Sequence, residues 1–222
     1  GLRSAREWER AEGSDGHAVR LRPAYRSALV KLGTVRMALA HSELALESFL
    51  AVLALDPSNA DASFNAALCQ HLLRQFDAAQ ASYQRAIELD PRNPVTHMQL
   101  GRLHNERLET DDALREFRKA LDLNPRDAEA WAEIAIVHEQ TNRLDDAARA
   151  IVAGLAAVPG DPGLQLEQAK LDRRNGDAEA SLRGLRGLDH ARLHPRRRPQ
   201  FQDDMGGARR AVGETAGAAA GT

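Results

Sequence analysis

Several features that would indicate particular classes of protein are scarce or missing in this sequence. Its 222 residues contain one cysteine, Cys69, which excludes an internal disulfide. Aromatic residues make up only 4%, and the net charge is −2, so no global charge draws the chain to nucleic acid or to a membrane surface. We find no apolar run of roughly 18 residues and no secretory signal pattern. The composition predicts a cytoplasmic protein without nucleic-acid or membrane partners.

Motifs of catalysis are also missing. The sequence has no Gly-rich phosphate loop ending in Lys-Ser/Thr, no nucleophile elbow, no cysteine pair and no His-Glu-x-x-His helix. His97 and His104 share a helix face, and His138 follows His104 by 34 residues, but a zinc site needs further ligands nearby. Hydrogen bonding along or between helices is the favoured interpretation of these histidines. We expect no catalytic residue, no cofactor and no metal.

A fixed period of 34 residues is the main feature that the sequence does contain. Prolines recur at this spacing, and such a period is typical of stacked repeats. They are Pro23, Pro57, Pro91, Pro125 and Pro159.

Helix starts follow the same period. Asparagine or aspartate, whose side-chain oxygens accept hydrogen bonds from the first-turn N–H groups, stands at one set of positions. These residues are Asn59, Asn93, Asp127 and Asp161. An acid, which complements the positive end of a helix dipole, stands at a second set. These residues are Glu43, Asp77, Asp111, Asp145 and Glu179. Each repeat is therefore predicted to hold two helices joined by a short turn.

Three further columns predict how the helices pack. Two are small, which allows paired helices to approach closely, and one is bulky, which fills the space between neighbouring repeats. The small columns are Gly33, Ala67, Gly101, Ala135 and Ala169, and Ala45, Ala79, Ala113, Ala147 and Ser181. The bulky column is Phe49, Tyr83, Phe117, Ile151 and Leu185.

Together these columns resemble tetratricopeptide repeats over about residues 24–190. Trp131 stands in the tryptophan column of that family, whereas the tyrosine that usually follows the glycine is replaced, for example by His104 and His138. The resemblance implies an all-α fold, a right-handed α-solenoid of about five tetratricopeptide helical hairpins. Gln165 and Gln168 stand in usually apolar columns, so the fifth repeat fits least well.

The expected domain organisation follows from the repeats. Residues 1–23 form a frayed N-terminal half-repeat, and residues 24–193 form the solenoid. Its units are 24–57, 58–91, 92–125, 126–159 and 160–193. Residues 194–222 hold a basic loop followed by either a truncated sixth repeat or a disordered tail. Because neither alternative supplies a polar capping helix, we expect the chain to be part of a longer protein.

In such solenoids the first helices line a concave groove, which predicts where a partner binds. The groove should be apolar over the first three units and basic near its end. The residues assigned to it are Val30, Thr34, Phe64, Asn65, Leu68, Met98, Arg102, Lys170, Arg173 and Arg174. The apolar rows suit a protein or peptide partner. Alternatively, some of these apolar residues pack between adjacent first helices.

Two functional hypotheses remain open from the sequence. The first is a non-enzymatic scaffold that binds a peptide segment in the groove. The second is the N-terminal repeat arm of a larger bacterial transferase, a sulfotransferase or a glycosyltransferase, with its catalytic domain beyond this chain. Binding of a chaperone tail by the family's carboxylate clamp is not expected. Asn65 matches one clamp position, but Val30, Thr34, Val95 and Gln99 replace the other clamp residues.

Overall fold

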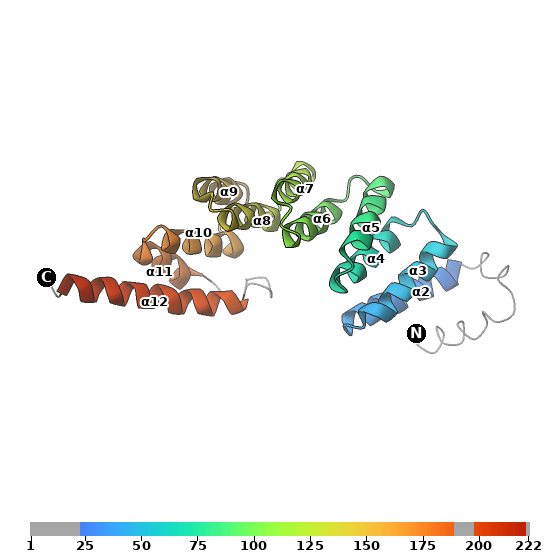
Figure 1. Ribbon diagram of the computed structural model, residues 1–222, viewed down its shortest axis with the longest axis horizontal. Helices are drawn as coiled ribbons and strands as arrows, with labels where there is room; N and C mark the ends of the chain where they lie inside the picture. Colours follow the sequence, from blue (N-terminus) through green and yellow to red (C-terminus); the bar gives the residue numbers. More distant parts are fainter. Residues whose placement is uncertain (1–22, 189–197, 221–222) are drawn as a thin grey trace. The chain divides into compact units, whose positions relative to one another are not determined.

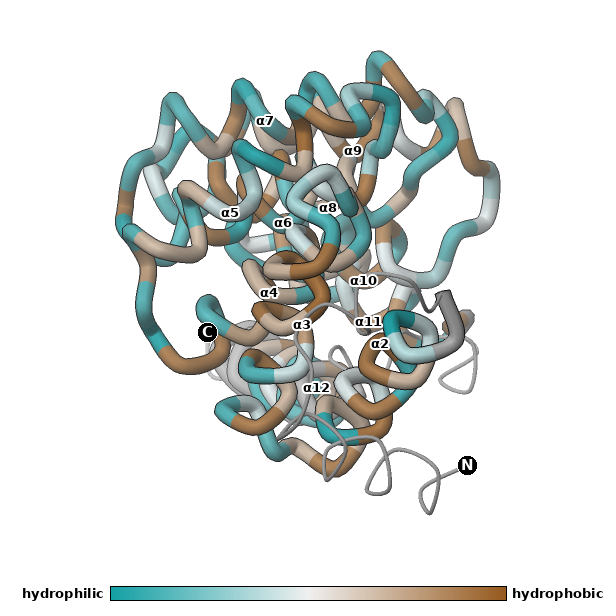
Figure 2. The backbone as a smooth tube through the Cα atoms, turned by 90° about the vertical axis from the view of Figure 1, so that its right-hand side faces the viewer, coloured by the Kyte–Doolittle hydropathy of each residue, from teal (hydrophilic) through white to brown (hydrophobic). Residues whose placement is uncertain are grey.

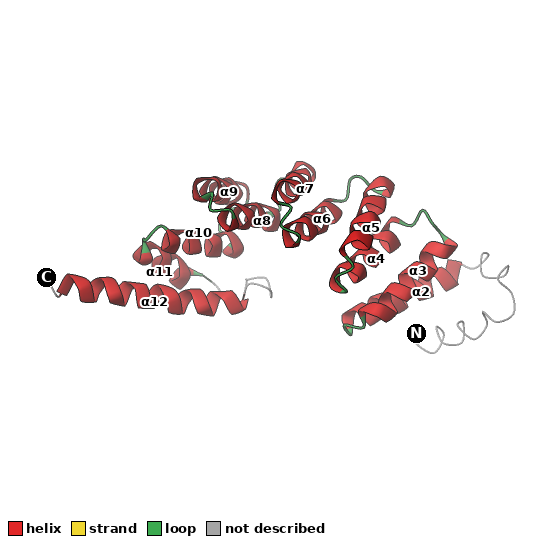
Figure 3. Cartoon of the chain, viewed as in Figure 1, coloured by secondary structure: helices red, strands yellow, loops and turns green. Residues whose placement is uncertain are grey.

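The computed structural model describes residues 23–188 and 198–220 of the chain (Figure 1). These described residues form helices joined by short turns and contain no strand (Figure 3). They divide into two compact units, with the boundary between Leu108 and Glu109, inside the third predicted repeat. Each unit is treated on its own below. The predicted half-repeat at 1–22 lies outside the described residues.

Unit 1 contains five helices, which are α2 (Pro23–Ala38), α3 (Ser42–Leu55), α4 (Ala60–Leu72), α5 (Phe76–Leu89) and α6 (Pro94–Glu106). Unit 2 contains α7 (Thr110–Leu123), α8 (Ala128–Gln140), α9 (Leu144–Ala157), α10 (Pro162–Arg174), α11 (Ala178–Gly187) and α12 (Arg198–Ala220). Within each unit, a first helix packs against the second helix of the preceding pair, as α4 does against α3 and α10 against α9. Hydrophobic and hydrophilic residues alternate along the helices (Figure 2), so each helix has an apolar face for such a neighbour.

The predicted caps of the first helices are confirmed. The side-chain oxygen of Asn59 accepts a hydrogen bond from the backbone N–H of Ala62, and Asp161 accepts one from Leu164. Asn93 and Asp127 cap α6 and α8 in the same way. The second helices α3, α5, α7 and α9 lack such a side-chain cap. The predicted acids lie in their first turns and complement the helix dipole there.

The turn inside each hairpin is a feature that the sequence pattern did not reveal. One residue in each turn has a positive φ, and these residues also recur every 34 positions. They are Ala40 (58°), Arg74 (59°), Leu108 (62°), Asn142 (58°) and Gly176 (87°). In the first turn, the N–H of His41 donates to the carbonyl of Arg36 and the N–H of Ala40 to that of Met37. This pair of hydrogen bonds is a Schellman motif, which ends the first helix.

Burial confirms the packing columns. The bulky side chains Phe49, Tyr83, Phe117, Ile151 and Leu185 are all at most 1% exposed. Facing residues must be small for this arrangement to fit. A Cβ atom added to Gly33 would lie 2.8 Å from the Cζ atom of Phe49, well inside van der Waals contact. The same side-chain pattern therefore sets both the helix spacing and the core.

Helix α12 stands where the sequence left open a sixth hairpin or a disordered tail. It is one continuous helix of 23 residues, so Gly206 and Ala218 lie in the same helix rather than in a helical pair. Phe201 and Ala208 pack against Leu182, Leu185 and other buried residues of α10 and α11. Helix α12 thereby covers the apolar face that α11 leaves open, which is the role of a terminal capping element.

Candidate functional site

The apolar row predicted on unit 1 is only partly accessible. Val30 on α2 and Phe64 on α4 are half-buried, whereas Met98 on α6 is only 4% exposed. Phe64 lies against Tyr83, with ring centroids 6.1 Å apart and an interplanar angle of 56°. The burial of Met98 agrees with the alternative that part of the row packs inside the helical stack.

The second predicted row runs one turn further along the same helices. Thr34 is exposed, and its hydroxyl donates to the carbonyl of Val30 at 2.9 Å. Leu68 is half-buried and packs on the cluster around Ala67, Tyr83 and Leu103. Arg102 is also half-buried. Unit 1 therefore presents a mixed surface in which apolar carbons are flanked by a hydroxyl group and a guanidinium group.

Asn65 lies beside this row on α4. Its amide nitrogen donates to the carbonyl of Asp61 at 2.8 Å, and the side chain is half-buried. This hydrogen bond along the helix holds the amide group in place. The amide oxygen is the group that could accept a hydrogen bond from the backbone of an incoming peptide.

The three basic residues predicted to end the groove belong to unit 2, and each forms an ion pair within it. Lys170 Nζ lies 3.1 Å from Glu167 Oε1, one turn earlier on α10. Arg173 joins α10 to α12, with Nη2 2.7 Å from Asp204 Oδ1. Gly207 leaves room for this guanidinium, because a Cβ atom there would collide with it. These residues link helices of unit 2.

Arg174 forms the third of these ion pairs. Its Nη1 donates to the Glu139 carbonyl at 3.1 Å and lies 3.4 Å from Glu139 Oε2 on α8. Burial raises the pKa of Glu139, and the neighbouring Glu167 raises it further, while Arg174 acts in the opposite direction. Burial likewise raises the pKa of Asp204. The basic end predicted from the sequence is thus a network of opposite charges.

A cleft in unit 2 was not predicted. It has a volume of about 830 Å³ and opens between α7 and α9, with α8 lining it between them (Figure 1). Its charged and aromatic lining residues are Arg118, Asp122, Trp131, His138, Asp146 and Arg149. The alanines Ala150 and Ala153 line the cleft from α9 and leave space opposite Trp131. That pairing of small residues with the tryptophan column was the signal in the sequence that could have indicated it.

His138 is the least satisfied polar group of this cleft. It is 6% exposed, and its Nδ1 atom has no hydrogen-bond partner among the described residues. Leaving such a group unpaired costs about 1–3 kcal/mol. Burial lowers the pKa of His138, the positive charge of Arg143 lowers it further, and Asp146 opposes this. His138 is therefore neutral at neutral pH.

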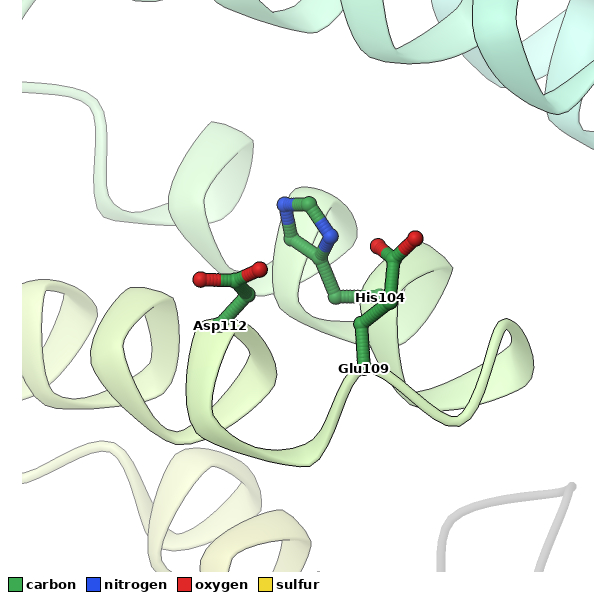
Figure 4. A group of neighbouring side chains, drawn as sticks. All are labelled: His104, Glu109 and Asp112. Atoms are coloured by element: carbon green, nitrogen blue, oxygen red, sulfur yellow. The ribbon is translucent and has the colours of Figure 1, made fainter.

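His104 lies in another group of polar residues. Figure 4 shows His104 from α6 with Glu109 and Asp112 from the start of α7. One potential ligand atom from each lies within 4.8 Å of the others. His104 belongs to unit 1 and the two acids to unit 2, and partly exposed carboxylates are common without a metal ion. We assign this group no ligand.

Comparison with known proteins identifies the repeats. The profile of the tetratricopeptide repeat family matches residues 30–94 and 98–162, which is more than half of the chain. The chain belongs to the tetratricopeptide repeat family. Its all-α fold is accordingly the helical solenoid of that family. No curated protein sequence matches it.

Three solved structures of tetratricopeptide repeat type illustrate the shared fold. PilF of Pseudomonas aeruginosa aligns with a TM-score of 0.65 and 20% identity, over 84% of this chain and 88% of PilF. A thermophilic tetratricopeptide protein of Thermus thermophilus aligns with a TM-score of 0.62 and 20% identity, over 84% and 98%. YrrB, a tetratricopeptide protein described as having an unusual peptide-binding site, aligns with a TM-score of 0.60 and 19% identity, over 88% and 95%. Identities this low support the fold alone.

The membrane prediction was examined on the same helices. Among residues 23–188 and 198–220, no helix combines the length and the apolar character needed to span a bilayer.

Proposed function

We propose that this protein is a non-enzymatic scaffold that binds a peptide segment of another protein on the first helices of unit 1. The observation that carries the proposal is the half-buried apolar row of Val30, Phe64 and Leu68 on α2 and α4. Apolar side chains that keep part of their surface in water gain free energy when a partner covers them. Membership of a family of repeat scaffolds supports the same assignment.

The polar residues beside the row would position the peptide. Asn65 would accept a hydrogen bond from the peptide backbone, and Thr34 and Arg102 would contact its side chains. Met98 would support the row from beneath, since it is buried. Lys170, Arg173 and Arg174 take no part in this proposal because they form ion pairs within unit 2.

We also propose that the protein is cytoplasmic. Cys69 is a free, buried thiol, and burial raises its pKa to about 11, so it is protonated and unreactive at neutral pH. A lone thiol agrees with a reducing compartment. Fractionation of cells that express the full-length protein would test the location, and recovery outside the cytoplasm would contradict it.

The binding proposal can be tested with peptides selected from a displayed library of random 12-residue sequences. The dissociation constant of the best peptide is measured by fluorescence polarisation for the wild type and for Phe64→Ala. Loss of an apolar anchor should weaken binding at least about tenfold, or about 1.4 kcal/mol. Leu50→Ala is the matched control, because Leu50 is 47% exposed on the second helix α3. Equal affinities for Phe64→Ala and Leu50→Ala, with both variants folded by circular dichroism, would contradict the proposal.

A further inference from the structure

The cleft between α7 and α9 has the features of a built binding site. Its lower part is apolar, with Leu121, Ile134 and Ala150 all at most 7% exposed. The indole N–H of Trp131 donates to the carbonyl of Pro125 at 3.1 Å, which holds the half-buried ring in place. Volumes of 300–1,000 Å³ are typical of sites for small ligands or short segments. About 830 Å³ is therefore enough for a few amino-acid residues.

His138 supplies a second and independent observation. More than nine-tenths of its surface is buried, it lines the cleft, and its Nδ1 lacks a hydrogen-bond partner within the described part of the chain. Buried polar groups in folded proteins are normally paired. A ligand atom in the cleft is the partner that would satisfy this nitrogen.

The charges around His138 are predominantly positive. The charged groups that act on it are Arg118, Arg143 and Arg149, with Asp146 as the one acid. Arg149 is paired with Asp146, one turn away on α9. Arg118 is exposed and makes no ion pair in the described residues. This end of the cleft thus carries an excess of positive charge, while Trp131 provides a flat apolar surface nearby.

We propose that this cleft binds an acidic peptide segment of a protein partner. A carboxylate of the peptide would lie against Arg118 and His138, and a neighbouring apolar side chain would cover Trp131. A guanidinium–carboxylate contact of this kind is a charge-assisted hydrogen bond. The site is separate from the row on unit 1, so it stands or falls independently of that proposal.

Trp131 allows a direct test in the full chain. The sequence has one other tryptophan, Trp8, so a Trp8→Phe variant makes Trp131 the only indole emitter. The ligand is the pentapeptide acetyl-Leu-Glu-Leu-Glu-Leu-amide, compared with the same peptide carrying glutamine in place of glutamate. We expect a saturable change in emission with a Kd below about 1 mM for the acidic peptide, and binding at least about tenfold weaker for the glutamine peptide.

Two variants locate the contact. Arg118→Gln should weaken the acidic peptide about tenfold, whereas Arg126→Gln, an exposed arginine in the α7–α8 turn, should change its affinity less than about twofold. His138→Leu should also lose binding but raise the Tm, because it removes an unpaired buried nitrogen. The Tm separates lost binding from lost folding.

Four results would overturn the proposal. They are no saturation at 10 mM peptide, roughly, in low salt, equal affinities for the two peptides, unchanged binding by Arg118→Gln, and a fall in Tm with intact binding in His138→Leu. A final arm uses glutarate alone. If glutarate binds as tightly as the acidic peptide, the site takes a small dicarboxylate and the peptide assignment is wrong.

Discussion

The first helices of the two units share a backbone pattern but differ in the chemistry that they carry outside the core. In unit 1, Val30, Phe64 and Leu68 keep part of their apolar surface accessible. In unit 2, Arg173 and Arg174 link α10 to α12 and α8 through ion pairs. The buried columns repeat in both units, so they determine the fold. Residues between the columns are free to differ, and they determine what each unit can bind.

The core columns should produce the largest effect. Tyr83→Ala removes a fully buried ring of unit 1 and should lower the free energy of unfolding by about 3–5 kcal/mol. Urea denaturation measures this loss, and hydrogen exchange should become faster in α4 and α5. Tyr83→Phe is the matched control. The Tyr83 hydroxyl has no hydrogen-bond partner among the described residues, so its removal should stabilise the protein by about 1 kcal/mol.

The hairpin turns give the next largest effect and opposite signs in the two units. Gly176→Ala in unit 2 forces a Cβ atom into a left-handed conformation and should cost about 1–2 kcal/mol. Ala40→Gly in unit 1 relieves that strain but adds backbone entropy to the unfolded chain, leaving a gain of about 0.5–1 kcal/mol. Thermal unfolding measures both changes. A stabilising Gly176→Ala would contradict the assigned turn geometry.

The buried carboxylates of unit 2 predict a dependence on pH. The folded-state pKa of Glu139 is raised above 4.5, so the folded protein binds a proton more tightly than the unfolded chain does. Relative to Glu139→Gln, the wild type should therefore gain stability as the pH falls from 7 towards 4.5. Urea titrations of both proteins at several pH values measure the difference. A constant difference would show that Glu139 is not desolvated as described.

The ion pair between Arg174 and Glu139 should have the smallest effect. The Arg174 side chain is 41% exposed, and solvent weakens such pairs. Arg174→Gln should lower the free energy of unfolding by less than about 1 kcal/mol. Arg85→Gln, which breaks an exposed pair with Glu88 in unit 1, is the control. A loss well above 1 kcal/mol for Arg174→Gln alone would make the network of unit 2 a major source of stability.

Much of the fold could be predicted because buried positions accept few residue types. Phe49 requires a small neighbour at Gly33, so the spacing of such residues along the chain records which helices pack together. The capping oxygens of Asn59 and Asp161 were equally recognisable, because few side chains can satisfy the free N–H groups of a first turn. These local requirements repeat every 34 residues and are visible in one sequence.

The remaining features depend on contacts that leave no periodic signal. Arg173 meets Asp204 across 31 residues, and Arg174 meets Glu139 across 35, in places where many other side chains would also fit. The left-handed turns were missed because Ala40, Arg74 and Leu108 stand where glycine would have marked them. The cleft required the relative positions of three helices. For these reasons the candidate site was predicted less completely than the core.

The central claim is that peptide contacts lie on unit 1 while the basic residues of unit 2 are structural. Isothermal titration of a library-selected peptide into two double variants tests it most directly. Val30→Ser/Leu68→Ser should raise the Kd at least about tenfold, and Arg173→Gln/Arg174→Gln should leave it within about twofold of the wild type. The reverse pattern, with both variants folded, would contradict the account.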